Sequence, residues 1–249
     1  MDLIWWEWAA LLVASATIGF AKTAIGGAGT LAVVLFASVL PARESTGVLL
    51  PLLIAADLIA IWVYRRDVDW STLFRLFPTV AVGILLGAWF LSGADDASVK
   101  RIIAILVLGG VLLTVRNRVR SGRTEAAPRT DRRSLIGAGA TGVGTGFTSM
   151  VANAAGPLMA LYLLFVGLDV RRFVGTTAWF FFIVNVAKLP FSAGLGLVTA
   201  DSLRLNAQLA PMILVGAAAG TALIRRVSQV AFEWAVLAAA GLSAVLLLL

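Results

Sequence analysis

Long apolar runs separated by short polar stretches dominate the chain from end to end. A helix needs about 20 apolar residues to cross a membrane. The third, fourth, eighth, ninth and tenth runs meet this length, whereas the sixth and seventh are shorter. The pattern predicts an all-α polytopic membrane protein with five apolar segments on each side of a central polar stretch. The segments run approximately over 3–20, 24–41, 46–63, 76–93, 99–115, 135–150, 152–166, 173–193, 205–224 and 228–249.

The two sets of five segments resemble each other in sequence. Glycines, one proline, two apolar residues and one polar position recur at a separation of 127 to 133 residues, which is far longer than the period of a solenoid. This separation predicts a transporter-type duplication, with 1–115 and 134–249 as the two repeats. Each repeat begins with a short broken-helix pair, re-entrant or spanning, followed by three transmembrane helices. The matched pairs are Gly19/Gly146, Phe20/Phe147, Gly29/Gly156, Leu31/Leu158, Gly47/Gly175, Asp57/Asn185, Pro78/Pro211, Gly83/Gly216 and Gly87/Gly220.

The composition supports a membrane protein and excludes several kinds of chemistry. Hydrophobic residues make up 60% of the 249 residues and charged residues only 13%, whereas soluble domains carry about 25% charged residues. The chain has no histidine and no cysteine, so it has no imidazole base, thiolate nucleophile, His/Cys metal site or disulfide. We therefore expect no cofactor and no metal ion. A membrane-embedded enzyme is the least favoured class of function.

Positive charge is concentrated between the two repeats. Residues 116–133 carry seven arginines against Glu125 and Asp131, within a chain of formal net charge +7. Basic loops are typical of the cytoplasmic side of a membrane, which predicts a cytoplasmic linker here and no nucleic-acid partner. Fourteen of the 20 basic residues then lie inside. With both termini outside, each half crosses the cell (inner) membrane an odd number of times, so the repeats have inverted topology.

Each repeat contains one glycine-rich break within its first pair of segments. A helix that restarts inside a membrane leaves its first N–H groups without partners and points the positive end of its dipole into the cavity, so its backbone can hold a small anion. We predict restarts after Gly26 and Gly27 and after Asn153 and Ala154, both directed at one site near the midplane. The alternative is that these small residues only let helices pack closely. Recurrence of the break in both repeats favours a binding site.

Two lysines interrupt apolar runs. A charge at membrane depth is costly and usually lines a polar path, so Lys22 and Lys188 are candidate cationic partners for an anion. Lys22 alternatively lies at a segment end, where its side chain reaches the interface. Lys188 alternatively reaches the interface too, or forms a salt bridge with Asp57.

Asp57 is the most deeply placed carboxylate, and Asn185 is its counterpart in the second repeat. A carboxyl group at this depth can bind and release a coupling proton. A structural ion pair or hydrogen bond is the alternative. Asn153, Thr148 and Ser149 can donate hydrogen bonds to an oxyanion, although serine and threonine in membrane helices often bond to their own backbone. With Asn185, these side chains complete the predicted substrate site.

Two further patterns predict packing rather than chemistry. Gly83 and Gly87 are four residues apart in the first repeat, and Gly216 and Gly220 have the same spacing in the second. Small residues at this spacing let membrane helices approach closely, so we expect equivalent helix contacts in the two halves. The aromatic run at 179–182 is interpreted as a lipid-facing or core face rather than a ligand cage.

The two breaks and their surroundings resemble a known family of permeases. Residues 146–163 and 175–185 look like the second half of the sulfite exporter TauE/SafE family, and 19–29, 40–47 and 50–57 resemble its first half. The resemblance covers nearly the whole chain. It implies export or uptake of small sulfur-containing anions, such as sulfite or organosulfonates including sulfoacetate.

These observations predict a permease that moves a small inorganic or organic anion through the midplane site by alternating access, in contact with membrane lipid. Proton coupling at Asp57 is one option. An anion channel is the main alternative, because the same backbone site serves a channel equally well. The sequence contains no ATP-binding motif, so we expect ion gradients, the anion's own gradient or the membrane potential to drive transport.

Overall fold

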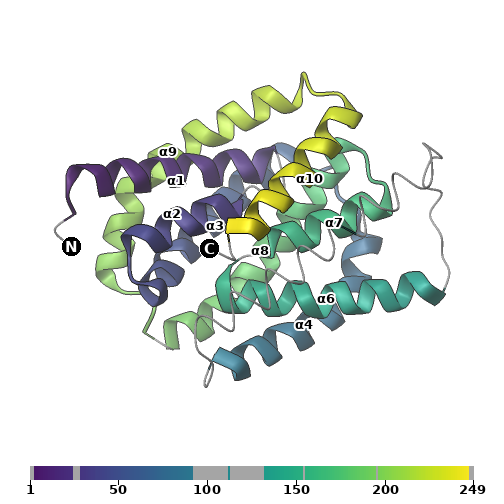
Figure 1. The fold of residues 1–249 in the computed structure, drawn as a ribbon, viewed down its shortest axis with the longest axis horizontal. Helices are drawn as coiled ribbons and strands as arrows, with labels where there is room; N and C mark the ends of the chain where they lie inside the picture. Colours follow the sequence, from purple (N-terminus) through teal and green to yellow (C-terminus); the bar gives the residue numbers. More distant parts are fainter. Residues whose placement is uncertain are drawn as a thin grey trace.

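The computed structural model of the chain describes residues 3–24, 29–91, 112, 132–153, 155–194 and 196–246. Within these ranges the chain forms nine helices and no strand (Figure 1). This confirms the predicted all-α class. The helices are α1 (Trp5–Thr23), α2 (Gly29–Val39), α3 (Ala42–Tyr64), α4 (Trp70–Leu91), α6 (Arg132–Ala152), α7 (Gly156–Val166), α8 (Val170–Gly194), α9 (Ala200–Ile224) and α10 (Gln229–Leu246).

Four of the described helices are long and apolar enough to cross a membrane: α3 from Gly47 onward, α4, α8 and α9. They correspond to the third, fourth, eighth and ninth predicted segments, so the chain is a multi-pass membrane protein. The tenth predicted segment forms α10, whose described apolar part, Gln229–Ala239, is shorter. The predicted segment 99–115 lies outside the described residues except for residue 112. The linker 116–133 lies outside them except for Arg132 and Arg133, with which α6 begins.

Both predicted helix breaks are present, between α1 and α2 and between α6 and α7. Ala24 leaves the helical conformation with φ −130°, and Asn153 has φ 52°, a left-handed conformation that asparagine adopts more readily than most residues. α7 then restarts with Pro157 in its first turn, where the fixed φ of proline suits a helix start. Three residues of the predicted site fall in the breaks but outside the described residues: Gly26, Gly27 and Ala154.

The helices that follow the breaks are short. α2 and α7 have 11 residues each, and a helix of this length extends about 16 Å at 1.5 Å per residue. The hydrocarbon core of a bilayer is about 30 Å thick. Each short helix therefore covers about half of the core, and its first residue can lie near the middle.

Two helix pairs, α1 with α9 and α4 with α6, pack backbone against backbone. Figure 1 shows α1 beside α9 and α6 beside α4 on opposite sides of the molecule. Glycine is required at these contacts because a Cβ would overlap the facing backbone. This confirms the predicted packing role of the two small-residue motifs. The contacts join Gly19 with Ile213 and Ala217, Gly216 with Ala16 and Phe20, Gly146 with Val80 and Ile84, and Gly83 with Val143 and Phe147.

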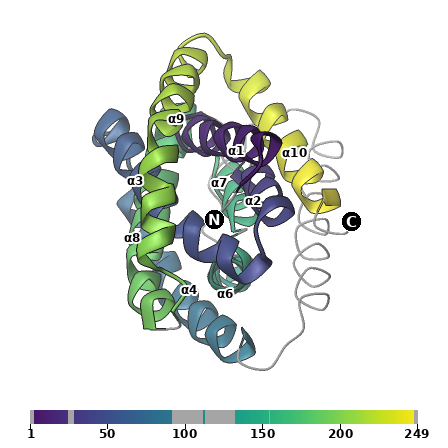
Figure 2. The same cartoon turned by 90° about the vertical axis from the view of Figure 1, so that its left-hand side faces the viewer.

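α3 and α8 lie side by side between these two pairs (Figure 2). Gly47, near the start of α3, contacts the backbone of Leu197 just after α8, and Gly175, near the start of α8, contacts the backbone of Asp67 just after α3. The two helices are therefore antiparallel. Their midpoints, which contain Asp57 and Asn185, meet at the centre of the molecule.

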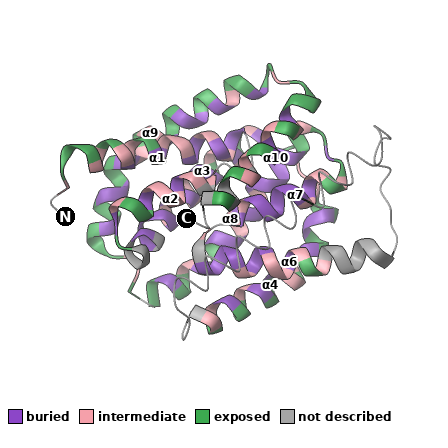
Figure 3. Cartoon of the chain, viewed as in Figure 1, coloured by how far each residue is buried: buried purple, intermediate pink, exposed green. Residues whose placement is uncertain are grey.

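Figure 3 shows exposed residues, in green, on the outward faces of the helices, and many of them are large hydrophobic residues. Trp62, Leu85 and Trp89 are among the large hydrophobic residues that are more than 60% exposed. A soluble protein would hide such side chains, whereas a bilayer solvates them. The outer surface of the described helices thus suits contact with lipid.

Candidate anion-binding site

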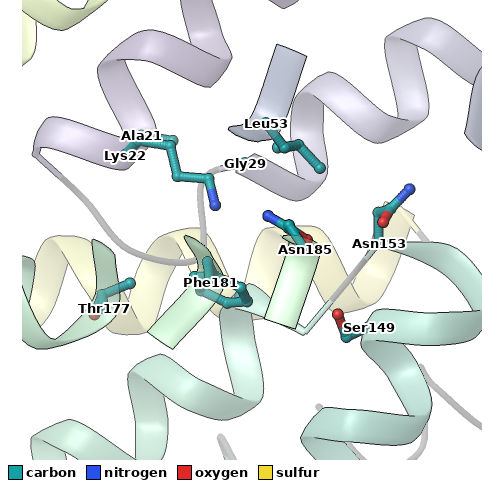
Figure 4. A pocket seen from close by; sticks show the side chains of 10 residues that line it. Ala21, Lys22, Gly29, Leu53, Ser149, Asn153, Thr177, Phe181 and Asn185 are labelled. Carbon is teal, nitrogen blue, oxygen red and sulfur yellow. The ribbon is translucent and has the colours of Figure 1, made fainter. Parts of the chain in front are cut away.

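A cavity lies where the two helix breaks approach α3 and α8 (Figure 4). Its volume is about 40 Å³, and about 10–15 Å³ is enough for one water molecule. It therefore has room for a few waters or one small oxyanion. Its lining consists of Ala21, Lys22, Gly29, Leu53, Ser149, Asn153, Gly156, Thr177, Phe181 and Asn185.

The first residues of both restarted helices line this cavity. Gly29 begins α2 and Gly156 begins α7. At α7 the N-cap residue, Ala155, provides no side-chain cap, so the side chain at this position satisfies none of the N–H groups of the first turn. Each start also contributes the positive end of a helix dipole. The first residues of α2 and α7, Gly29 and Gly156, thus lie at one cavity.

Lys22 forms a buried ion pair with Asp57. The Nζ atom of Lys22 is 2.7 Å from Oδ1 of Asp57, and Asn185 donates from Nδ2 to Oδ2 of the same carboxylate at 2.8 Å. Asp57 is completely buried, and the Lys22 side chain is 10% exposed. Lys22 therefore does not reach the interface. Its ammonium also lies 4.2 Å from the centre of the Phe181 ring, a cation–π arrangement.

Lys188 is also buried, but its partners are neutral. Nζ donates to the backbone oxygen of Ser149 at 2.8 Å, to Oγ of Ser149 at 3.1 Å and to Oδ1 of Asn153 at 2.6 Å. Only 2% of Lys188 is exposed, so it does not reach the interface. The predicted alternative of a salt bridge between Lys188 and Asp57 is wrong, because Asp57 pairs with Lys22. Lys188 instead donates to one carbonyl in the last turn of α6, that of Ser149, where the helix dipole is negative.

The structure brings most of the predicted site residues together. Lys22, Ser149, Asn153 and Asn185 line the cavity. Figure 4 shows Lys22 from α1 and Asn185 from α8 directed toward the same space, with Ser149 and Asn153 beside it. Two further predicted residues, Asp57 and Lys188, contact residues of this lining.

Thr148 is the exception among the described residues. Its hydroxyl donates to the backbone oxygens of Gly144 at 2.9 Å and Thr145 at 3.2 Å. The hydroxyl group thus makes its hydrogen bonds to the backbone of α6, as threonine in a membrane helix commonly does. Thr148 thus shows the alternative considered from the sequence, a hydroxyl bonded to its own helix.

Several lining residues were not predicted as site residues. Gly29 and Gly156 were matched between the repeats, and this signal could have identified both as helix starts. Phe181 belongs to the aromatic run that was interpreted as a packing face, yet its ring lies under Lys22. Leu53 and Thr177 carry no sequence signal of a site, because both lie within continuous apolar helices.

The family of the chain follows from comparison with known proteins. The family model for the sulfite exporter TauE/SafE matches residues 11–247. The chain belongs to this family. The match extends from α1 to α10 of the TauE/SafE protein and includes both breaks. No curated protein and no solved structure matches the chain. TauE/SafE proteins are membrane transporters, so this chain is a membrane permease.

Proposed function

We propose that this TauE/SafE protein carries a small sulfur-containing anion, such as sulfite or an organosulfonate, across the membrane, with the cavity between the breaks as its binding site. One observation carries the proposal: the first residues of two restarted helices, Gly29 and Gly156, and the buried Lys22 all line the same cavity. Helix starts and an ammonium group each attract negative charge. Their convergence inside a membrane protein favours a small anion as the ligand.

We further infer that the protein consists of two inverted halves. The glycine contacts support this arrangement, because they recur at fixed offsets. The partners of Gly83 in α6 and of Gly216 in α1 differ by 127 residues, and the partners of Gly146 in α4 and of Gly19 in α9 differ by 133. These are the separations at which the sequence itself repeats.

The contact between Asp57 and Asn185 supports a pseudo-two-fold axis through the site. The two residues are counterparts separated by 128 positions, and they are hydrogen bonded to each other. Two equivalent residues can touch only if they lie close to the axis that relates them. The antiparallel packing of α3 against α8 agrees with an axis in the membrane plane. Alternating access then consists of the two halves moving relative to each other about the cavity.

Asp57 offers a route to proton coupling. An anion that binds beside Lys22 competes with the carboxylate of Asp57, which then retains only its hydrogen bond from Asn185. A buried carboxylate without a counter-ion is costly, and taking up a proton removes its charge. Proton uptake is thereby linked to anion binding when the ligand displaces Lys22 from Asp57, and not when the ion pair stays in place.

Flux measurements in proteoliposomes test the proposal. Sulfite, sulfate, sulfoacetate, taurine and formate are supplied in turn, with and without a pH gradient, and we expect saturable uptake of at least one sulfur anion. The double variant Lys22→Met/Asp57→Leu replaces the ion pair by apolar side chains, a change that buried pairs often tolerate. It should abolish flux while the protein remains folded.

Thr148→Val is the matched control, because Thr148 is buried nearby but bonds within its own helix. It should retain flux. Normal flux in the Lys22→Met/Asp57→Leu variant would contradict the assignment of the site. Uptake that rises linearly with concentration without saturation would favour a channel over a carrier.

A further inference from the structure

We propose that the cavity selects anions with a single negative charge, and that Asp57 sets this preference. The proposal rests on the proposed function and narrows its substrate class to monoanionic sulfur oxyanions, such as an alkylsulfonate or hydrogensulfite. Dianions of similar size, such as sulfate, are discriminated against. Three ionisable groups lie at the site: Lys22, Asp57 and Lys188.

Lys22 and Asp57 neutralise each other. Their charged atoms are 2.7 Å apart and the carboxylate has no exposed surface, so the pair presents almost no net charge to a ligand. Asn185 supports this arrangement by donating to the second carboxylate oxygen. The pair therefore acts as one neutral unit as long as the contact between Lys22 and Asp57 stays in place.

Lys188 supplies the positive charge that remains. Its three hydrogen bonds go to a backbone carbonyl, a side-chain amide oxygen and a hydroxyl. In its charged form the ammonium group donates one N–H to each of these three oxygens. None of the three carries a negative charge. Among the described residues, the site with Lys188 charged therefore holds two cations and one carboxylate, a net charge of +1.

A buried charge that is neutralised only by dipoles is costly. A monoanion in the cavity brings the net charge of the site to zero. A dianion leaves an excess negative charge, and it also loses more hydration on entry because hydration energy grows faster than charge. The site thus compensates the first negative charge of a ligand but not the second.

The walls of the cavity favour the same class of ligand. Leu53 and Phe181 form part of the lining and offer no hydrogen bond to a second charged oxygen group. They can contact the carbon substituent of a sulfonate, while its oxygens face the helix starts at Gly29 and Gly156. The charged end of the ligand therefore contacts the two helix starts, and its apolar end contacts Leu53 and Phe181.

Binding to the purified full chain in detergent tests this preference, with methanesulfonate and sulfate as probes in isothermal titration calorimetry. The wild type should bind methanesulfonate more tightly. The quantity compared is the ratio of the affinity for methanesulfonate to the affinity for sulfate. Asp57→Asn raises the charge of the site to +2, and this ratio should fall by at least about tenfold, in favour of sulfate. Lys188→Gln lowers the charge to zero, and the ratio should move toward methanesulfonate by a similar factor.

The double variant Asp57→Asn/Lys188→Gln separates charge from local structure. It restores a net charge of +1 through Lys22, so the wild-type ratio should return even though two side chains have changed. Thr148→Val serves as the control and should leave the ratio as it is in the wild type. Melting temperatures identify variants that fail to fold. If Asp57→Asn fails to fold, Lys188→Gln and the double variant carry the test.

The possible results are distinct. A wild type that prefers sulfate, or a ratio that stays unchanged in the folded single variants, would overturn the charge selection and leave the anion site intact. A wild type that binds neither probe and transports no sulfur anion would overturn the proposed function itself. Opposite shifts in the two single variants, cancelled in the double variant, would establish the preference and its origin in Asp57.

Discussion

Replacing Gly146 by alanine should weaken the contact between α6 and α4. The added Cβ would overlap the carbonyl oxygen of Val80 and lie 2.9 Å from its carbonyl carbon and 3.0 Å from the amide nitrogen of Ile84. Non-bonded carbons prefer separations of about 3.5–4.0 Å, so the two helices must move apart by at least about 0.6 Å. Overpacking of this kind costs about 1–3 kcal/mol. This cost equals or exceeds the about 1 kcal/mol that alanine gains over glycine inside a helix.

Gly144→Ala provides the matched control on the same helix. A Cβ at Gly144 meets Leu158 at 3.5 Å, which is ordinary contact, so this variant should be as stable as the wild type or more stable by up to about 1 kcal/mol. Thermal unfolding of the purified protein in detergent measures both variants. Gly146→Ala should melt below the wild type and below Gly144→Ala. Equal melting temperatures for the two variants would refute the claim that backbone contact at Gly146 holds α4 and α6 together.

The remaining predictions concern the repeat, the topology and the linker. Gly19→Ala, at the counterpart contact with Ile213 in α9, should lower the melting temperature about as much as Gly146→Ala; a much smaller effect would count against equivalent halves. A single cysteine introduced at position 122 or 126 of this cysteine-free chain should resist a membrane-impermeant thiol reagent in intact cells, and ready labelling would reverse the predicted orientation. Replacement of residues 121–131 by a neutral flexible segment should preserve transport, because a basic, proline-containing stretch without apolar periodicity is typical of a tether. Loss of substrate binding in correctly inserted protein would make the linker part of the site.

The spanning helices could be predicted because a membrane imposes one simple requirement, an uninterrupted apolar run of about 20 residues. This requirement is visible in the sequence of α3, α4, α8 and α9. The breaks were visible for a related reason, since glycine and asparagine interrupt apolar runs at matching positions in the two repeats. Both features are local properties of the chain.

The partners of the buried charges could not be predicted in the same way. The pairing of Lys22 with Asp57 joins α1 to α3 and depends on how each helix is rotated about its axis. A membrane helix that is apolar on all sides has no polar face to indicate this rotation. Sequence reasoning therefore considered Lys188 as a partner of Asp57, whereas Lys188 caps α6 through Ser149 and Asn153.

The same limitation explains the errors at single positions. Neighbouring residues on a helix point about 100° apart, so only one of Thr148 and Ser149 faces the cavity, and nothing in their apolar surroundings indicates which. Phe180 and Phe181 differ in the same manner. Phe180 stacks on Phe77 in the core, whereas Phe181 lies against Lys22 at the site.

The position of a bound anion shows whether the cavity between the two helix starts is the binding site. Bromomethanesulfonate is a monoanionic sulfonate whose bromine scatters X-rays anomalously, so crystals of the protein grown with it would locate the ligand independently of the rest of the map. We predict an anomalous peak in the cavity lined by Gly29 and Gly156, with the sulfonate oxygens within hydrogen-bond distance of Lys22. Strong binding in solution combined with an anomalous peak elsewhere on the protein, and none in this cavity, would contradict the account.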